Sequence, residues 1–156
     1  MASSVTERSK DVEIRRLLDF AFSHELGTVG IHADSGATPH DAKSGLSVAE
    51  IADKNEFGRA QERIPQRSFV RGWFDENQEA LHARLKGKLA LALLAKSTVA
   101  KAVEASMKEF AESMKQRIRN RIPPRNARRT LAKKIGDTPL IDTRVMINSI
   151  QGRHRG

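Results

Sequence analysis

Hydrophobic residues recur at helical spacing in two long stretches of the chain. The first stretch starts near Ser68, and its large apolar residues lie mostly four apart, at Phe69, Trp73, Leu81, Leu85, Leu89 and Leu93. The second starts at Ser97 or Thr98, with an apolar line at Val99, Val103, Met107, Phe110, Met114 and Ile118. Apolar residues three or four apart share one helix face, so the pattern predicts two long amphipathic helices, the second over 98–122. Pro123-Pro124 should end that helix sharply.

One run inside the first predicted helix is apolar on every side. It covers Leu89-Ala90-Leu91-Ala92-Leu93-Leu94. A helix that is apolar all round is normally covered on more than one side. We therefore expect this run to be buried, either in the core or against a neighbouring molecule. It is too short to cross a bilayer.

Shorter signals predict the elements of the N-terminal half. Ser4-Val5-Thr6-Glu7 has the spacing of a capping box, and the apolar face that follows predicts a helix ending at Gly27. The β-branched residues of Thr28-Val29-Gly30-Ile31 predict a short strand. A second capping box, Ser47-Val48-Ala49-Glu50, predicts a helix that runs to about Glu56 and stops at Gly58.

The remaining segments read as connections and short elements. His32 to Gly45 is rich in small residues, Gly and Pro, so we expect a mobile loop, centred on residues 34–46. Residues 123–137 should form a basic connector with one helical turn. Pro139-Leu140-Ile141 looks extended, and Asp142 or Thr143 should cap a short helix through Ile147. A last strand should begin at Ile150-Gln151.

Length and composition indicate one domain with a lean core. The chain has 156 residues, of which 38% are hydrophobic, and it has no Cys, which excludes disulfides and thiolate metal sites. The N-terminal segment carries charges where a signal peptide needs an apolar run, so we expect a soluble, unexported protein.

Positive charge is concentrated in one interval. The net charge is +9, and between Glu112 and Asp137 there is no acidic residue. The interval holds nine basic residues, which we propose as a contact surface: Lys115, Arg117, Arg119, Arg121, Arg125, Arg128, Arg129, Lys133 and Lys134. Such a block favours an anionic partner, either nucleic acid or an acidic protein surface, although a solvated basic face is the plain alternative. No aromatic residue occurs from Ala111 to Gly156, so base stacking is unsupported and only non-specific backbone contact is expected.

Candidate catalytic and metal-binding chemistry is sparse. His32, Asp34, His40 and Asp41 could ligate Zn²⁺ or Mn²⁺, but their spacing matches no established site and a Gly-rich loop holds ligands poorly, so we favour a solvated loop. Glycine-rich phosphate loops and nucleophile elbows are missing. We therefore expect no catalytic residues, no bound metal and no cofactor; a hydrolase that uses the His/Asp loop is the alternative reading.

Three segments in fixed order resemble a known family. The stretch from Ala49 to Gly58 resembles the pattern AxIAxxNEFG, and the stretch from Ile64 to Arg71 resembles IPxRPFxR, with Ser68 in place of Pro. The stretch from Pro139 to Ile150 resembles PLIDTGxLxxSI, with Arg144 in place of Gly and Met146 in place of Leu. These patterns are typical of the tail-completion and head–tail joining (neck) proteins of tailed bacteriophages. The motif residues are Asn55, Glu56, Phe57, Gly58, Ile64, Pro65, Arg67, Phe69, Pro139, Leu140, Asp142, Thr143 and Ser149.

The resemblance implies both a fold and a role. It implies a single α+β domain over residues 1–156, with a small antiparallel sheet packed against long amphipathic helices. It implies a structural virion protein, assembled in the bacterial cytoplasm, that forms a homo-oligomeric ring, a hexamer in our reading. The ring would join the portal–adaptor complex of the head to tail-tube or tail-terminator proteins, with packaged DNA nearby and no membrane. A non-specific basic nucleic-acid-binding protein is the alternative.

Within these motifs we expect two aromatic anchors and one adaptable arginine. Phe57 and Phe69 should both be buried against the long helices. Arg67 could pair with a carboxylate such as Glu56 or remain exposed. If Arg144 stands where relatives need the positive φ of Gly, the local turn should differ here.

Overall fold

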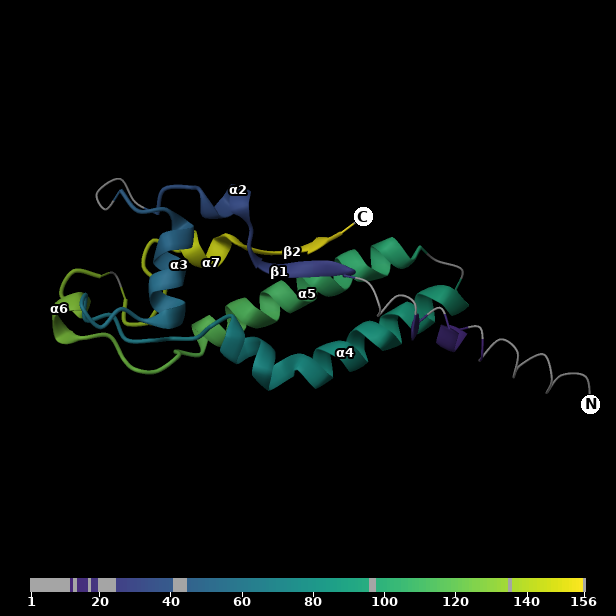
Figure 1. The fold of residues 1–156 in the computed structure, drawn as a ribbon. Coiled ribbons are helices and arrows are strands. Elements are labelled where there is room, and N and C mark those ends of the chain that lie inside the picture. Colours follow the sequence, from purple (N-terminus) through teal and green to yellow (C-terminus); the bar gives the residue numbers. More distant parts are fainter. Residues whose placement is uncertain are drawn as a thin grey trace, which may run out of the picture.

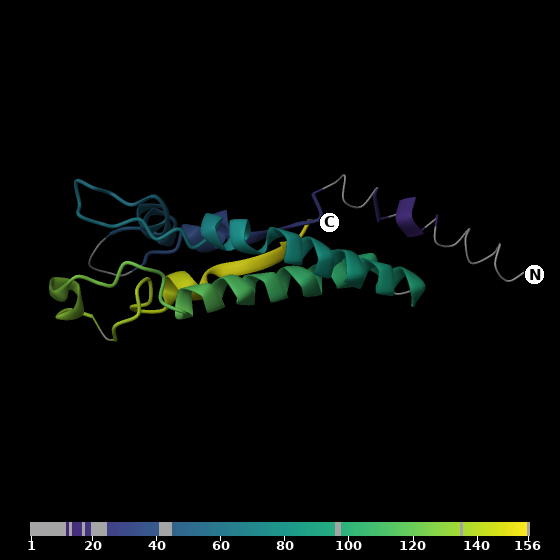
Figure 2. The same ribbon diagram turned by 90° about the horizontal axis from the view of Figure 1, so that it is seen from below.

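The computed structural model confirms an α+β fold. It describes residues 12, 14–16, 18–19, 25–40, 45–95, 98–134 and 136–155. Two long helices, α4 (Arg71–Leu94) and α5 (Val99–Arg119), run back to back along the molecule, and a small sheet lies against α5 (Figures 1 and 2). The short elements α3, α6 and α7 gather at the end of the molecule where α4 begins and α5 ends (Figure 1).

The two long helices form where the apolar spacing predicts them. Their buried faces make most of the core through Trp73, Leu81, Leu85, Leu89, Val103, Met107, Phe110, Met114 and Ile118. Thr98 is the N-cap of α5, and Asn120 follows its last residue, Arg119. The helix therefore ends before the 122 that the sequence suggested, and Arg121 has a positive φ of 63°.

The all-round apolar run of α4 is only partly covered. Leu89 and Ala92 are buried, but Leu91 is 67% exposed and Leu94 is 65% exposed. The core of this chain therefore covers one side of the run, and cover of the other side by a neighbouring molecule stays a prediction. In a fold of two layers, a helix contacts the core with one face only. No residue that the structure describes covers the opposite face of α4 here.

The sheet consists of two antiparallel strands, β1 (Gly27–Ile31) and β2 (Ile150–His154), with Val29 opposite Gly152. This confirms both predicted strands. Gly152 lies so close to α5 that a Cβ there would stand 1.8 Å from the Met107 carbonyl oxygen.

Gly27 opens β1 and does not cap the preceding helix as predicted. Residues 12, 14–16 and 18–19 are helical, with Leu18 buried, and the predicted capping box at Ser4 lies outside the described residues.

The predicted mobile loop contains a structured part. A short helix, α2 (Ala33–Gly36), follows β1 directly. Further on, Pro39 and Ser47 form an antiparallel bridge, and the Val48 N–H donates to the Thr38 carbonyl at 2.9 Å. The structure does not describe residues 41–44 of this loop.

Helix α3 (Val48–Phe57) has the predicted capping box. Ser47 Oγ accepts from the Glu50 N–H at 3.3 Å, and the Glu50 carboxylate accepts from the Ser47 N–H at 2.8 Å. Gly58 ends the helix with a φ of 72°, a left-handed value that glycine adopts at low cost. Both predicted boundaries are therefore confirmed.

The C-terminal motif is folded into turns before β2. The basic connector has one helical turn, α6 (Arg128–Leu131), as predicted. Pro139-Leu140 forms a turn with Leu140 at φ 64°, so the extended reading is wrong. The last helix, α7 (Val145–Asn148), has Arg144 as its N-cap residue in place of Asp142 or Thr143. Arg144 has a φ of 66°, so the turn is left-handed although an arginine stands at the position where the motif pattern has Gly.

Candidate functional site

The three motifs meet at one groove. It has a volume of about 990 Å³ and lies between the loop that follows α3 and the basic connector around α6. We call it the motif groove. Its walls carry eight of the thirteen motif residues, which are Asn55, Phe57, Gly58, Ile64, Pro65, Arg67, Leu140 and Asp142. The connector contributes Arg125, Asn126, Ala127, Arg129, Thr130 and Lys134. Segments far apart in sequence therefore form a single concave surface.

Glu56 builds the junction behind the groove. Its carboxylate is buried and accepts four hydrogen bonds from the start of α4. Oε2 accepts from the N–H groups of Phe69 and Val70 at 2.8 and 3.0 Å, and Oε1 accepts from the Arg71 N–H at 3.0 Å and the Ser68 hydroxyl at 2.6 Å. A negative charge is favourable at a helix N-terminus because the free amides there carry partial positive charge. Glu56 therefore fixes the direction in which α4 leaves the groove.

Arg67 joins the loop before α4 to the connector after α5. Its side chain is buried, and Nε donates to the Pro124 carbonyl at 2.9 Å. Its terminal nitrogen donates to the Arg125 carbonyl and to Asn126 Oδ1, both at 3.4 Å. Both readings of Arg67 were wrong, because it is neither paired with Glu56 nor exposed. Burial lowers the pKa of the Arg67 guanidinium from its usual value, and backbone carbonyls take the place of an acidic partner.

Gly58 and the hairpin after it shape one wall. Arg59 and Ile64 pair through two backbone hydrogen bonds of 2.8 and 3.0 Å and close a tight loop. A Cβ at Gly58 would stand 2.8 Å from the Gln66 nitrogen. Glycine is required here both by the close approach and by the positive φ. The loop thus brings Ile64 and Pro65 to the groove.

Phe57 is an exposed residue of the groove. It is 61% exposed, whereas Phe69 is 1% exposed. The prediction of two buried anchors is therefore confirmed for Phe69 and wrong for Phe57. The last turn of α3 directs position 56 into the protein, and a neighbouring helix position points about 100° away. An exposed aromatic residue beside a groove is a feature of contact surfaces.

Lys134 and Asp142 face the groove from the connector and the C-terminal motif. Lys134 Nζ donates to the Thr138 carbonyl at 2.6 Å and is half-buried. Burial lowers the pKa of Lys134, while the nearby Asp142 carboxylate acts in the opposite direction. The groove carries six Arg or Lys side chains, at Arg59, Arg63, Arg67, Arg125, Arg129 and Lys134, against two acidic ones, Glu62 and Asp142. Its potential is therefore positive.

The nine basic residues divide into three groups. Four are in ion pairs with acids of the same chain: Lys115 and Arg119 with Glu112, Arg117 with Glu76, and Arg121 with Asp137. Lys134 is held by Thr138 as described above. The other four, Arg125, Arg128, Arg129 and Lys133, are exposed and have no ion pair within the described part of the chain. Positive charge that is open to a partner is therefore concentrated on and around α6.

The other motif residues have structural positions. Pro139 is buried, and Thr143 is exposed beside the start of α7. Ser149 Oγ donates to the Val145 carbonyl at 2.9 Å, and its own carbonyl accepts from the Ser35 hydroxyl at 3.2 Å. Ser149 therefore joins the end of α7 to α2.

No protein-family model, curated protein or solved structure matches this chain. The interpretation of the groove therefore depends on its sequence motifs and its geometry alone. The wall residues Ile51, Arg63 and Met146 were missed by sequence reasoning. Ile51 and Met146 fall inside the first and third motif stretches without having been named as site residues, and Arg63 directly precedes the second stretch; only the folded arrangement brings the three to the groove.

The His/Asp loop is engaged in contacts that stabilise the fold. His32 Nε2 lies 3.2 Å from the Gln151 carbonyl, and the Asp34 carboxylate accepts from Arg153 at 2.6 Å. Among the described residues, no group of three His, Asp or Glu side chains is placed to hold a metal ion, and Asp41 lies outside them. Similarly, no described helix has the length and apolar character needed to cross a membrane.

Proposed function

We propose that this protein is a structural subunit of the neck of a tailed-bacteriophage virion. In this role it forms a homo-oligomeric ring, a hexamer in the simplest arrangement, that joins the head to the tail. It acts by binding copies of itself and adjacent virion proteins and turns over no substrate. Its place of action is the virion, after assembly in the host cytoplasm.

One observation carries this proposal. The motifs behind the family resemblance are dispersed over about a hundred positions of sequence, yet they converge on the motif groove and its supporting junction. Their buried members, Glu56 and Arg67, hold the walls in place. Phe57, one of their exposed members, offers apolar surface. A shared pattern that preserves one concave surface without acid–base or metal chemistry is the expected outcome when the function is docking.

Electron microscopy tests the proposal. The purified protein is imaged alone, and virions of the source phage are analysed by mass spectrometry and by labelling of a tagged copy. We expect closed rings in class averages and the tag at the head–tail junction. A protein that is missing from purified virions and shows no effect on tail attachment when its gene is deleted would contradict the proposal.

A second candidate is supported by the exposed cations around α6. Arg125, Arg128, Arg129 and Lys133 could neutralise nucleic-acid phosphates, each contact releasing counterions. With about four contacts, the logarithm of the binding constant should fall with the logarithm of salt concentration with a slope of about −3 to −4. A titration of labelled duplex DNA at several salt concentrations measures this slope. Binding with that slope, together with absence from virions, would favour the second candidate.

A further inference from the structure

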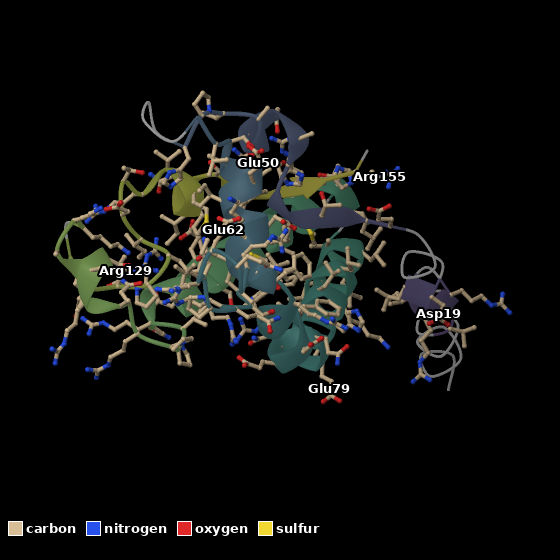
Figure 3. All side chains as sticks on the ribbon, turned by 60° about the vertical axis from the view of Figure 1, so that its left-hand side comes forward. Asp19, Glu50, Glu62, Glu79, Arg129 and Arg155 are labelled. Carbon is tan, nitrogen blue, oxygen red and sulfur yellow. The ribbon has the colours of Figure 1, made fainter. Side chains whose placement is uncertain are left out.

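A surface on α4 is complementary in charge to the motif groove. Its first turns expose Phe74, which is 45% exposed, and two carboxylates, Asp75 and Glu79. Asp75 and Glu79 are four residues apart, so they share one helix face. We call Phe74, Asp75 and Glu79 the acidic ridge. Figure 3 shows Glu79 directed away from the body of the protein, whereas Arg129 lies on α6 in a different part of the surface.

The charges of the ridge are largely available to a partner. The Asp75 carboxylate lies 4.0 Å from Arg71, at the limit of an ion pair, and its side chain is 63% exposed. Glu79 is exposed and has no ion pair with any residue that the structure describes. By contrast, Glu76 in the same segment is already paired with Arg117.

We infer that the motif groove of one copy binds the acidic ridge of the next copy. The inference deepens the proposed function and rests on it, because it names the contact that closes the ring. Phe74 would occupy the apolar part of the groove beside Phe57, and Asp75 and Glu79 would face Arg125 and Arg129. An exposed apolar residue flanked by acids on one surface, and an apolar groove rimmed by bases on the other, satisfy each other in charge and in hydrophobicity.

The separation of the two surfaces determines the type of assembly. A patch that binds a different patch on its neighbour makes a heterologous, head-to-tail contact. Such contacts form a closed ring when the rotation per subunit divides a full turn. A two-fold dimer would need both patches on one continuous face, so that groove meets ridge in both directions at once, and the groove alone, with six basic side chains, would repel its own copy.

Charge reversal tests the inference in two ways: each variant alone should lose assembly, and the combined variants should recover it. One variant reverses the groove, with Arg125→Glu and Arg129→Glu, and a second reverses the ridge, with Asp75→Lys and Glu79→Lys. All four side chains are exposed, so the variants should keep the far-UV circular dichroism and melting temperature of the natural chain. Sedimentation velocity measures assembly. Each variant alone should assemble only at a protein concentration at least ~100-fold higher than the natural chain needs, because like charges then face each other.

An equimolar mixture of the two variants should recover assembly. In the mixture, a reversed groove meets a reversed ridge, and a natural groove meets a natural ridge. A chain carrying all four substitutions should likewise assemble by itself. The matched control, Arg16→Glu with Lys101→Glu, changes two exposed cations far from the groove and should assemble like the natural chain.

Four results would overturn the inference. Folded single variants that assemble normally, or a mixture that fails to recover, would show that another surface makes the contact, and the proposed function would stand if virions contain the protein. A natural chain that stays monomeric at every concentration would also refute it, while the virion analysis would decide the proposed function separately. If the groove variant lost binding of fluorescein-labelled single-stranded DNA and kept its assembly state, the occupant would be nucleic acid.

Discussion

The Glu56 carboxylate accepts the backbone N–H of Phe69 at 2.8 Å, across a hairpin that separates the two residues by thirteen positions. This bond is one of four by which α3 caps the first turn of α4. It explains why an acidic residue and an aromatic residue occur together in the two N-terminal motifs. Glu56 orders the amides at the start of α4, and Phe69 is the buried aromatic residue that directly precedes this helix.

Glu56→Gln should destabilise the protein by about 2–3 kcal/mol, because an amide cannot accept all four bonds and leaves buried N–H groups unsatisfied. Urea unfolding measures the change. Glu79→Gln is the matched control, since Glu79 is exposed, and its effect should stay within ~0.5 kcal/mol. Equal effects of the two substitutions would show that the cap contributes nothing to stability.

Phe69→Ala should cost about 3–5 kcal/mol, because it empties a fully buried site. Phe57→Ala should change stability by less than ~0.5 kcal/mol, because the side chain is mostly exposed. Thermal and urea unfolding of both variants provide the comparison. A loss of several kcal/mol in Phe57→Ala would place that ring in the core after all.

Periodicity made the long helices predictable. The apolar line of α5 repeats over six residues, so a single register satisfies all of them; five of the six are buried, Val99 is half-buried, and the spacing missed only the small buried residues Ser106 and Ala111. The capping box at Ser47 and the stop at Gly58 were predictable because their signals are local. The position of Phe57 was not, because the pattern of α3 does not show which face meets the core.

Contacts between distant segments explain the remaining misses. Arg67 finds its partners in the carbonyls of Pro124 and Arg125, and a carbonyl has no sequence signature. The nine-residue basic block reads as uniform in sequence. Folding brings Glu76 to Arg117 and Asp137 to Arg121, so the positive charge that is left without an acidic partner is concentrated around α6.

Two glycine substitutions should have opposite effects. Gly152→Ala should destabilise the protein by about 3 kcal/mol or more, because the new methyl group would overlap the Met107 carbonyl and push β2 off α5. Gly87→Ala should stabilise it by about 1 kcal/mol, because Gly87 lies inside α4 and nothing lies within 4 Å of the added Cβ. Urea unfolding measures both. A tolerated Gly152→Ala would contradict the close packing of the sheet on the helix.

Arg144→Gly should stabilise the protein by about 0.5–1 kcal/mol. Arg144 has a φ of 66°, a conformation that costs an L-residue about 1–2 kcal/mol, and the greater freedom of glycine in the unfolded chain offsets part of the gain. Lys101→Gly is the control, because this exposed position is inside α5 and should lose about 1 kcal/mol. Destabilisation by Arg144→Gly would mean that the arginine side chain makes contacts worth more than the strain.

The contact between α4 and α5 should weaken in acid through Glu109. The Glu109 carboxylate on α5 accepts a hydrogen bond from Lys88 and lies 3.4 Å from Arg84, both on α4. The bond from Lys88, with the charges of Lys88 and Arg84, lowers the pKa of Glu109 from its usual 4.5. The unfolded chain therefore binds the proton more readily than the folded one. The stabilisation is fully present above pH 4.5 and is lost as the pH falls through the lower pKa of the folded state.

Glu109→Gln should therefore reduce stability at pH 7 and have little effect near pH 3. The carboxylate is 41% exposed, so solvent screens the pair and the difference at pH 7 should be at most ~1 kcal/mol. Urea unfolding at several pH values measures the gap, which is the difference in free energy of unfolding between the variant and the natural chain. Glu79→Gln again serves as the control for removing an exposed carboxylate that has no ion pair with a described residue. A Glu109→Gln gap that is the same at pH 3 and pH 7 would mean that the ionised carboxylate does not hold the two helices together.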